Sequence, residues 1–287
     1  MNSALNLIKK VAQRSLPPTL YQRLGRLYDG FVPELANLSW QYSWAGFHNR
    51  RRIRRLHNAY SGRRCFIIGN GPSLSQTDLR RLAGEITIGC NNLFLIFDEI
   101  GFVPTFYTVE DHLVAEDRAE EINRIRGTAK IFPRDLAYCL LPDEDTTHIN
   151  FVRRYEPFPK FSNRFDKVVY FGGTVTHLNL QLAYHIGCRE VYLVGVDHNY
   201  QSPPDTEGNV IVSTGADADH FRPDYFGPGY RYHNPRVERM EKAYMATRDF
   251  AAHNNMKIYN ATIGGKLEVF PRVHYRDIVG DDKIGEL

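Results

Sequence analysis

Cys65-Phe66-Ile67-Ile68-Gly69-Asn70-Gly71-Pro72-Ser73-Leu74 is the stretch that predicts the fold. A short apolar run ends in a glycine-rich turn, and Ser75-Gln76-Thr77-Asp78 then resembles the start of a helix. In an open α/β sheet such a turn lies at the carboxyl end of a strand, where small ligands bind. Glycines let the backbone approach a ligand, and a helix N-terminus offers unpaired N–H groups to an anion. We therefore expect a phosphorylated ligand, such as a nucleotide, at this turn.

The turn differs from two familiar phosphate-binding motifs. A dinucleotide fingerprint has a third glycine where this chain has Leu74. A P-loop has Gly-Lys-Ser/Thr, whereas Gly265-Lys266 is followed by Leu267. A purely structural turn is the alternative, but Asn70 and Ser73 place polar side chains where a base, ribose or phosphate would lie.

The composition indicates one substantial domain with an appendage. The chain has 287 residues, of which 43% are hydrophobic. Its four cysteines are scattered with no C-x-x-C pair, which favours a reduced, cytoplasmic environment. No apolar run approaches the ~20 residues that span a bilayer, and no secretory signal is recognisable.

The charge is distributed unevenly along the chain. Residues 1–64 carry a net charge of +10, which leaves −7 for the remainder and +3 in total. We therefore predict that residues 1–60 form a basic helical N-terminal extension with an anionic binding partner. It lies either on an anionic bilayer or against the domain with its charges in water. No recognisable nucleic-acid-binding module accompanies the arginine-rich run at residues 50–55, so we expect no nucleic-acid partner.

From residue 61 to 287, strand and helix patterns alternate, which predicts an α/β domain with a doubly wound, mostly parallel sheet. The polar, Gly/Pro/Tyr-rich stretch at about 198–234 is long enough to be a lid over a binding site. The expected strands are 64–69, 85–90, 104–109, 128–132, 167–171, 190–195 and 256–260. The expected helices are 111–126, 174–187 and 235–254, the last with Asn234 as its cap and Pro235 in its first turn.

Polar residues just past the strand ends are the candidate site, because these ends converge on one edge of the sheet. They comprise Gly69-Asn70-Gly71-Pro72-Ser73, Cys90-Asn91-Asn92, Glu110-Asp111, Gly172-Gly173-Thr174 and Gly195-Val196-Asp197. The Gly172-Gly173-Thr174 turn also opens a helix and so repeats the anion-binding geometry. Asp197, after a buried strand, either binds a hydroxyl or cation or caps the next loop.

This ordered set of segments resembles two related groups over about residues 63–275. One is the MptE-like domain family, which includes archaeal 6-hydroxymethylpterin diphosphokinases and flagellin-glycosylation accessory proteins. The other is the bacterial sialyltransferases of glycosyltransferase family 42, which use CMP-activated sialic acid on a Rossmann-like sheet. The GNGPS turn at 69–73 and the VGVD block at 194–197 carry the resemblance.

The sialyltransferase resemblance implies roles for individual residues. It makes Asn70, Ser73 and Asn91 nucleotide contacts, and Asp197 matches the family's aspartate after the strand. His220, followed by an aromatic residue in the lid, fits the general base, and His233 is the rival. We also count Gly69, Gly71, Pro72, Glu110, Gly172, Gly173 and Thr174 as nucleotide-binding candidates. Asp197 is a further catalytic candidate, and Tyr225 and Tyr232 are catalytic candidates that steady the leaving phosphate.

These resemblances predict a transferase: a nucleotide-sugar-dependent, sialyltransferase-like glycosyltransferase that uses a CMP-sugar and needs no cofactor or metal. Its acceptor would be a cell-surface glycan or lipid-linked precursor, reached at the inner face of the membrane. The alternative is an MptE-like diphosphokinase of 6-hydroxymethyl-dihydropterin or a similar alcohol, using ATP and Mg²⁺ held by Glu110, Asp111 and Asp197. A non-catalytic nucleotide-binding accessory protein is the third possibility.

Overall fold

The computed structural model describes residues 38–154, 159–200 and 210–280. The chain divides into two compact units, residues 1–47 and 48–287. The division falls within helix α3 (Trp44–Leu56), and the boundary expected after residue 60 stays a prediction. Residues 1–37, most of the predicted N-terminal extension, lie outside the described residues, so its bilayer and domain-packed alternatives both stay open. No helix in the described ranges is long and apolar enough to cross a membrane.

The arginine-rich run of α3 makes specific contacts within residues 48–287. Arg52 donates to the backbone oxygens of Asp143, Glu144 and Thr146, and Arg54 pairs with Asp166 at 2.9 Å. Two of these arginines therefore tie the helix to segments that follow in the chain, rather than forming a simple solvated face.

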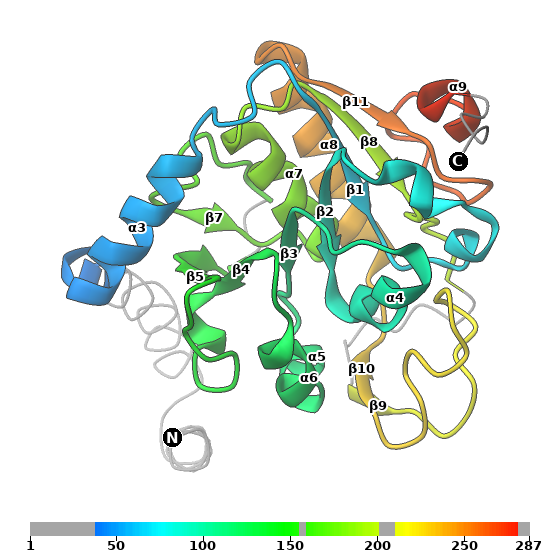
Figure 1. Ribbon diagram of the computed structural model, residues 1–287, viewed down its shortest axis with the longest axis horizontal. Helices are drawn as coiled ribbons and strands as arrows, with labels where there is room; N and C mark the ends of the chain where they lie inside the picture. The colour runs from blue at the N-terminus through cyan, green and yellow to red at the C-terminus, as the bar shows by residue number, and fades with distance from the viewer. Residues whose placement is uncertain (1–37, 155–158, 201–209, 281–287) are drawn as a thin grey trace, which may run out of the picture. The chain divides into compact units, whose positions relative to one another are not determined.

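A seven-stranded sheet forms the centre of the larger unit (Figure 1). Its order is β11-β8-β1-β2-β3-β4-β5, and every neighbouring pair is parallel. The strands are β1 (Arg64–Ile68), β2 (Ile86–Cys90), β3 (Phe106–Thr108), β4 (Ala129–Pro133), β5 (Thr146–Ile149), β8 (Glu190–Val194) and β11 (Lys257–Asn260). The predicted doubly wound α/β architecture is confirmed.

Alternate strand residues enter two apolar layers, as the twofold side-chain period of a strand requires. Cys65 and Ile67 of β1 pack in the layer formed with α7 (Val175–His185) and α8 (Val237–His253). Phe66 and Ile68 point to the opposite layer, formed with α4 (Phe97–Ile100) and α9 (Tyr275–Val279). Further along that face, α5 (His112–Asp117) and α6 (Ala119–Arg124) cover β3 and β4.

The strand order reverses next to β1, and this reversal decides where a ligand site forms. The chain runs outward from β1 through β5 and then returns to place β8 and β11 on the other side of β1. The loops after β1 and β8 consequently leave the sheet side by side at a topological switch point, where open α/β sheets form their ligand crevice.

Two strand predictions need correction. Residues 167–171 contribute β7 (Val169–Tyr170), which pairs with β6 (Phe151–Val152) in a separate small sheet. The seventh strand of the main sheet is instead β5, which the sequence analysis missed. Its sequence, Thr146-Thr147-His148-Ile149, is mostly polar and so does not resemble a buried strand, although all four residues are buried.

The predicted helix after the GNGPS turn is wrong. The chain forms two short 3-10 segments there, Pro72–Gln76 and Leu79–Leu82. Ser75 does not cap a helix, because its hydroxyl donates to the backbone oxygen of Pro72 at 2.8 Å.

Two other helix boundaries also differ from prediction. Helix α8 begins at Val237 with Arg236 as its N-cap, so the expected Asn234 cap is two residues too early. The expected helix 111–126 is divided at Arg118 into α5 and α6.

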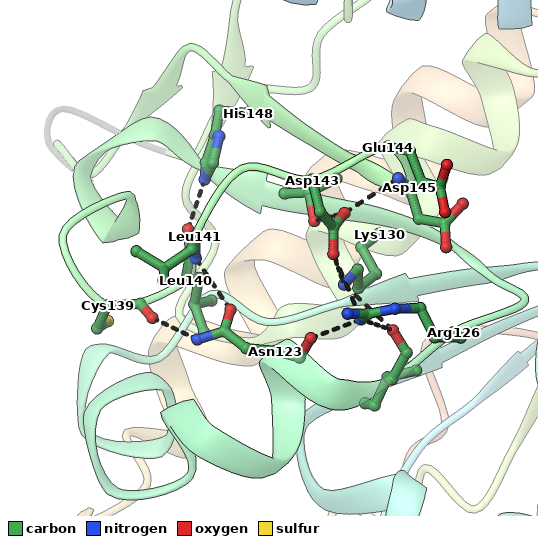
Figure 2. Close-up of polar contacts among 12 residues, drawn as sticks. Asn123, Arg126, Lys130, Cys139, Leu140, Leu141, Asp143, Glu144, Asp145 and His148 are labelled. Atoms are coloured by element: carbon green, nitrogen blue, oxygen red, sulfur yellow. Dashed lines mark hydrogen bonds and ion pairs between the residues drawn. The ribbon is translucent and has the colours of Figure 1, made fainter.

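A buried lysine connects β4 to the loop before β5. Lys130 has no exposed side-chain surface, and its Nζ donates to Asp143 Oδ2 at 2.5 Å and to the backbone oxygen of Ile125 at 3.2 Å (Figure 2). Burial raises the pKa of Asp143, but the hydrogen bonds from Lys130 and Thr146 outweigh it and hold the pKa at about 2. This ion pair therefore stabilises the sheet edge only while the carboxylate is ionised.

Candidate active site

A cavity of about 710 Å³ lies at the carboxyl ends of the central strands. Residues from the loops after β1, β2, β3 and β8 line it, together with the start of α7 and described residues of the stretch 198–234, which was predicted to be a lid and is called the lid below. A volume of this size is typical of small-molecule and cofactor sites. Of the predicted site residues, it is lined by Gly69, Asn70, Gly71, Asn91, Glu110, Asp111, Gly173, Thr174, Asp197, His220, Tyr225 and Tyr232, and also by the rival His233. Pro72, Ser73 and Gly172 do not line it.

The GNGPS turn packs directly against the loop after β8. Gly71 N donates to Gly195 O at 2.9 Å. A Cβ on Gly69 would lie 2.3 Å from Gly195 O, and one on Gly71 only 1.9 Å from Asp197 Oδ2. Both glycines are therefore needed for the close approach of two loops, in addition to any approach of a ligand.

Asp197 holds this turn in place. Its Oδ1 accepts from Ser73 N at 3.1 Å, and its Oδ2 accepts from Ser73 Oγ at 2.7 Å. Burial raises the pKa of Asp197, while the two Ser73 hydrogen bonds oppose the shift. The N–H and the hydroxyl of Ser73, a residue that we expected to contact the nucleotide, are thus both bonded within the protein. Asp197 acts here as a clamp between the β1 and β8 loops.

Two asparagines present unsatisfied oxygens at the cavity. Asn70 Nδ2 donates to Cys90 O at 3.2 Å, and Asn91 adopts a left-handed backbone with φ 49°. Within the described part of the chain, Asn70 Oδ1 and Asn91 Oδ1 are buried with no hydrogen-bond partner. A buried oxygen without a partner is costly, so both are suited to accept from the amino or hydroxyl group of a ligand.

Glu110 is a buried acid in the cavity wall. Burial raises its pKa to about 8, partly offset by the positive charge of Arg153 and supported by the neighbouring Asp111 and Asp135. The carboxyl group is therefore largely protonated at neutral pH. Its Oε2 has no partner among the described residues.

The second glycine turn begins α7 at the cavity. Gly173 has φ +78°, and a Cβ on Gly172 would lie 2.5 Å from the ring of His177. Thr174 caps the helix, its side chain accepting from Thr176 N at 3.3 Å. Residues 173–176 line the cavity, so the N-terminus of this 11-residue helix provides the positive end that favours phosphate.

The lid supplies an aspartate–histidine pair. His220 Nδ1 lies 2.8 Å from Asp217 Oδ2, and its ring stacks on Tyr225 with centroids 3.9 Å apart. The bond to Asp217 favours the tautomer with hydrogen on Nδ1, which leaves Nε2 free to accept a proton. Phe221 N donates to Asn70 O at 3.0 Å, so the lid is joined to the GNGPS turn beside this pair.

The two predicted catalytic tyrosines belong to this aromatic group. Tyr225 has only 1% of its surface exposed and supports the His220 ring. Tyr232 stacks on Phe226 at 5.2 Å. Asn92 Nδ2 donates to Tyr225 O at 3.1 Å, which anchors the lid to the segment after β2.

Sequence reasoning missed Asp217. The only available signal was its position three residues before His220, because the pairing depends on the path of an irregular loop.

The structure also changes which residues could bind a metal ion. Both carboxylate oxygens of Asp197 accept from Ser73, which leaves Asp197 poorly suited to hold Mg²⁺ with Glu110 and Asp111. In the described ranges, the one group with suitable spacing is Asp111, His112 and His233.

Comparisons with known proteins give a family and a distant structural likeness. No curated protein matches the chain. A solved structure, the MAf glycosyltransferase from Magnetospirillum magneticum AMB-1, aligns with 18% identity and a TM-score of 0.45. The alignment covers 80% of this chain but only 38% of that one. The family model described as 6-hydroxymethylpterin diphosphokinase MptE-like matches residues 45–203, more than half of the chain, and the protein therefore belongs to the MptE-like family.

Proposed function

We propose that the protein is a transferase that binds a nucleotide-activated sugar in the 710 Å³ cavity and transfers the sugar to an acceptor hydroxyl. The observation that carries this proposal is the His220–Asp217 pair on the cavity wall. It provides a base in the same cavity as the unsatisfied asparagine oxygens and the helix N-terminus.

The reaction we propose is a direct displacement. The acceptor oxygen attacks the anomeric carbon, the bond from that carbon to the phosphate oxygen breaks, and the nucleotide leaves with the bonding electrons. The acceptor proton passes to Nε2 of His220, and Asp217 stabilises the resulting imidazolium. The N–H groups at the start of α7 stabilise the charge on the departing phosphate. A CMP-sugar is the donor we propose first, on the resemblance to sialyltransferases.

The test combines ligand binding with turnover. Thermal shifts with CMP, CDP, UDP, GDP and ATP, each with and without Mg²⁺, identify the nucleotide, because a ligand of the native state raises the melting temperature. Release of nucleotide from the matching sugar donor is then measured for His220→Ala. We expect a loss of about 10²- to 10⁴-fold, the usual contribution of a general base.

The matched control is His253→Ala, which removes an exposed histidine on α8. It should leave turnover unchanged. If no nucleotide sugar is turned over, or if His220→Ala is as active as the parent protein, the proposal fails.

The diphosphokinase remains the second candidate, favoured by the match to the family model described as 6-hydroxymethylpterin diphosphokinase MptE-like. In that case ATP would be consumed in the presence of a hydroxymethylpterin, activity would require a divalent metal, and EDTA would abolish it. The acceptor, the membrane contact of residues 1–60 and the cytoplasmic location stay predictions.

A further inference from the structure

We propose that Asp111, His112 and His233 bind a divalent transition-metal ion at the rim of the cavity. Their potential ligand atoms all lie within 4.8 Å of one another. Metal–ligand bonds of about 2.0–2.2 Å place neighbouring ligand atoms of a tetrahedral site roughly 3.4 Å apart, so small side-chain movements suffice. All three residues line the cavity.

Two elements that are distant in sequence bring the ligands together. Asp111 is the N-cap of α5, and its Oδ1 accepts from Leu113 N at 2.8 Å, which fixes the orientation of the carboxylate. His112 is the first residue of the helix. His233 ends β10 (Arg231–His233), and its ring centroid lies 5.0 Å from that of His112.

An ion-pair clamp holds β10 against α5. Arg231 donates from its backbone N to Asp117 Oδ2 at 2.8 Å and from Nε to Asp117 Oδ1 at 2.9 Å. Its Nη2 also donates to Glu116 Oε2 at 2.9 Å. Arg231 is two residues from His233, and both acidic partners lie on the helix that begins at His112. The two histidines are therefore held as neighbours before any metal binds, which reduces the cost of assembling the site.

The ligand types indicate which metals fit. Two imidazoles and one carboxylate suit Zn²⁺, Co²⁺, Mn²⁺ or Fe²⁺, whereas Mg²⁺ prefers oxygen ligands alone. Three protein ligands also leave at least one coordination position open, as in catalytic rather than structural zinc sites. A water molecule or a phosphate oxygen of the donor could occupy this open position, because the three ligands line the cavity. The phosphate ligand rests on the proposed function.

The test measures metal binding by the whole protein without nucleotide. The metal-free chain, prepared without a histidine tag, is titrated with Zn²⁺ by calorimetry and with Co²⁺ by visible absorption. We expect one ion per chain. His112→Ala and His233→Ala should each weaken binding by about 100-fold or more, beyond the 10- to 100-fold that loss of an outer partner costs. His253→Ala is the matched control and should bind as the parent does.

His112 is exposed, so its replacement should leave the fold intact, as circular dichroism will verify. Unchanged Zn²⁺ affinity in both the His112 and His233 variants would overturn the proposal. The assay contains no sugar or nucleotide, so its outcome is independent of the reaction catalysed. If Zn²⁺ binds as expected but no nucleotide sugar is turned over, the metal site stands and the glycosyltransferase proposal fails.

Discussion

Replacing Gly71 by alanine tests whether the β1 and β8 loops are clamped as the structure indicates. The new Cβ would lie 1.9 Å from Asp197 Oδ2 and 3.0 Å from Asp197 Cβ. The backbone cannot retreat easily, because Gly71 N is bonded to Gly195 O. The Asp197 carboxylate must therefore move, and it then loses its two hydrogen bonds from Ser73.

The size of the effect follows from these two bonds. Hydrogen bonds to a charged group contribute about 1.5–3 kcal/mol each. Loss of both at a mostly buried carboxylate should therefore cost about 3 kcal/mol or more. For a domain of 150–250 residues each kcal/mol shifts the melting temperature by about 2–4 °C, so we expect a decrease of about 6–12 °C. Ser73→Ala removes only the hydroxyl bond and should cost roughly half as much.

Calorimetry and urea unfolding of these two variants provide the assay. Gly215→Ala is the control, because nothing lies within 4 Å of its added Cβ and its φ is not positive. It should melt at or slightly above the parent temperature. The same Gly71 variant should lose any nucleotide-induced thermal shift, since Asn70 moves with the turn. A Gly71→Ala protein that melts within 2 °C of the parent would refute the clamp.

Two further predictions concern ion pairs. Asp143→Asn should destabilise the protein by about 3 kcal/mol, because it leaves Lys130 charged and fully buried, whereas Lys130→Met should cost less. The folded pKa of Asp143, about 2, lies below its usual 3.8, so its stabilisation is complete above pH 4 and is lost as the pH falls toward 2. The free energy of unfolding should therefore fall by about 2 kcal/mol between pH 4 and pH 2. Urea unfolding across this pH range should show a smaller decrease in Lys130→Met. An equal decrease would contradict the assignment of this pH dependence to the Asp143–Lys130 pair. Arg231→Gln should weaken Zn²⁺ binding about 10-fold, because it removes the ion pairs that hold β10 against α5. Arg248→Gln, which changes an exposed arginine of α8, should leave the Zn²⁺ affinity unchanged. Calorimetry can compare the two variants, and equal affinities would argue against the clamp on β10.

The parts of the fold that could be predicted are those in which a local pattern and the final environment agree. The strands β1 and β8 are continuous apolar runs that end at glycine, and they are buried on both faces as such runs require. Strand β5 could not be predicted in this way. Its threonines and His148 are polar, yet they are buried at the sheet edge, where Arg52 and Asn49 bond its backbone. That environment comes from α3, almost a hundred residues earlier.

The candidate site likewise has features that the sequence predicts and features that only the three-dimensional structure reveals. The positions of the strand-end loops followed from topology alone, so the approach of Asn70, Asn91 and Asp197 to one cavity could be anticipated. The assignment of hydrogen bonds could not. The N–H of Ser73 was as available to a phosphate as to a carboxylate, and only the three-dimensional distance to Asp197 decides that it is used internally.

The histidines show most clearly why residue type alone does not assign chemistry. His177 bonds to Thr247 and to the Lys160 carbonyl, and burial lowers its pKa to about 4, so it stays neutral and structural. His220 has the same ring but a carboxylate partner and a cavity in front of it. His233 is held beside a second imidazole and a carboxylate, an arrangement that suits a shared metal ion. Hydrogen-bond partner, burial and neighbouring charge thus separate a core residue, a base and a metal ligand. A reversal of the expected results, with His220→Ala abolishing Zn²⁺ binding and His233→Ala leaving it intact, would mean that these three criteria assign the histidines incorrectly.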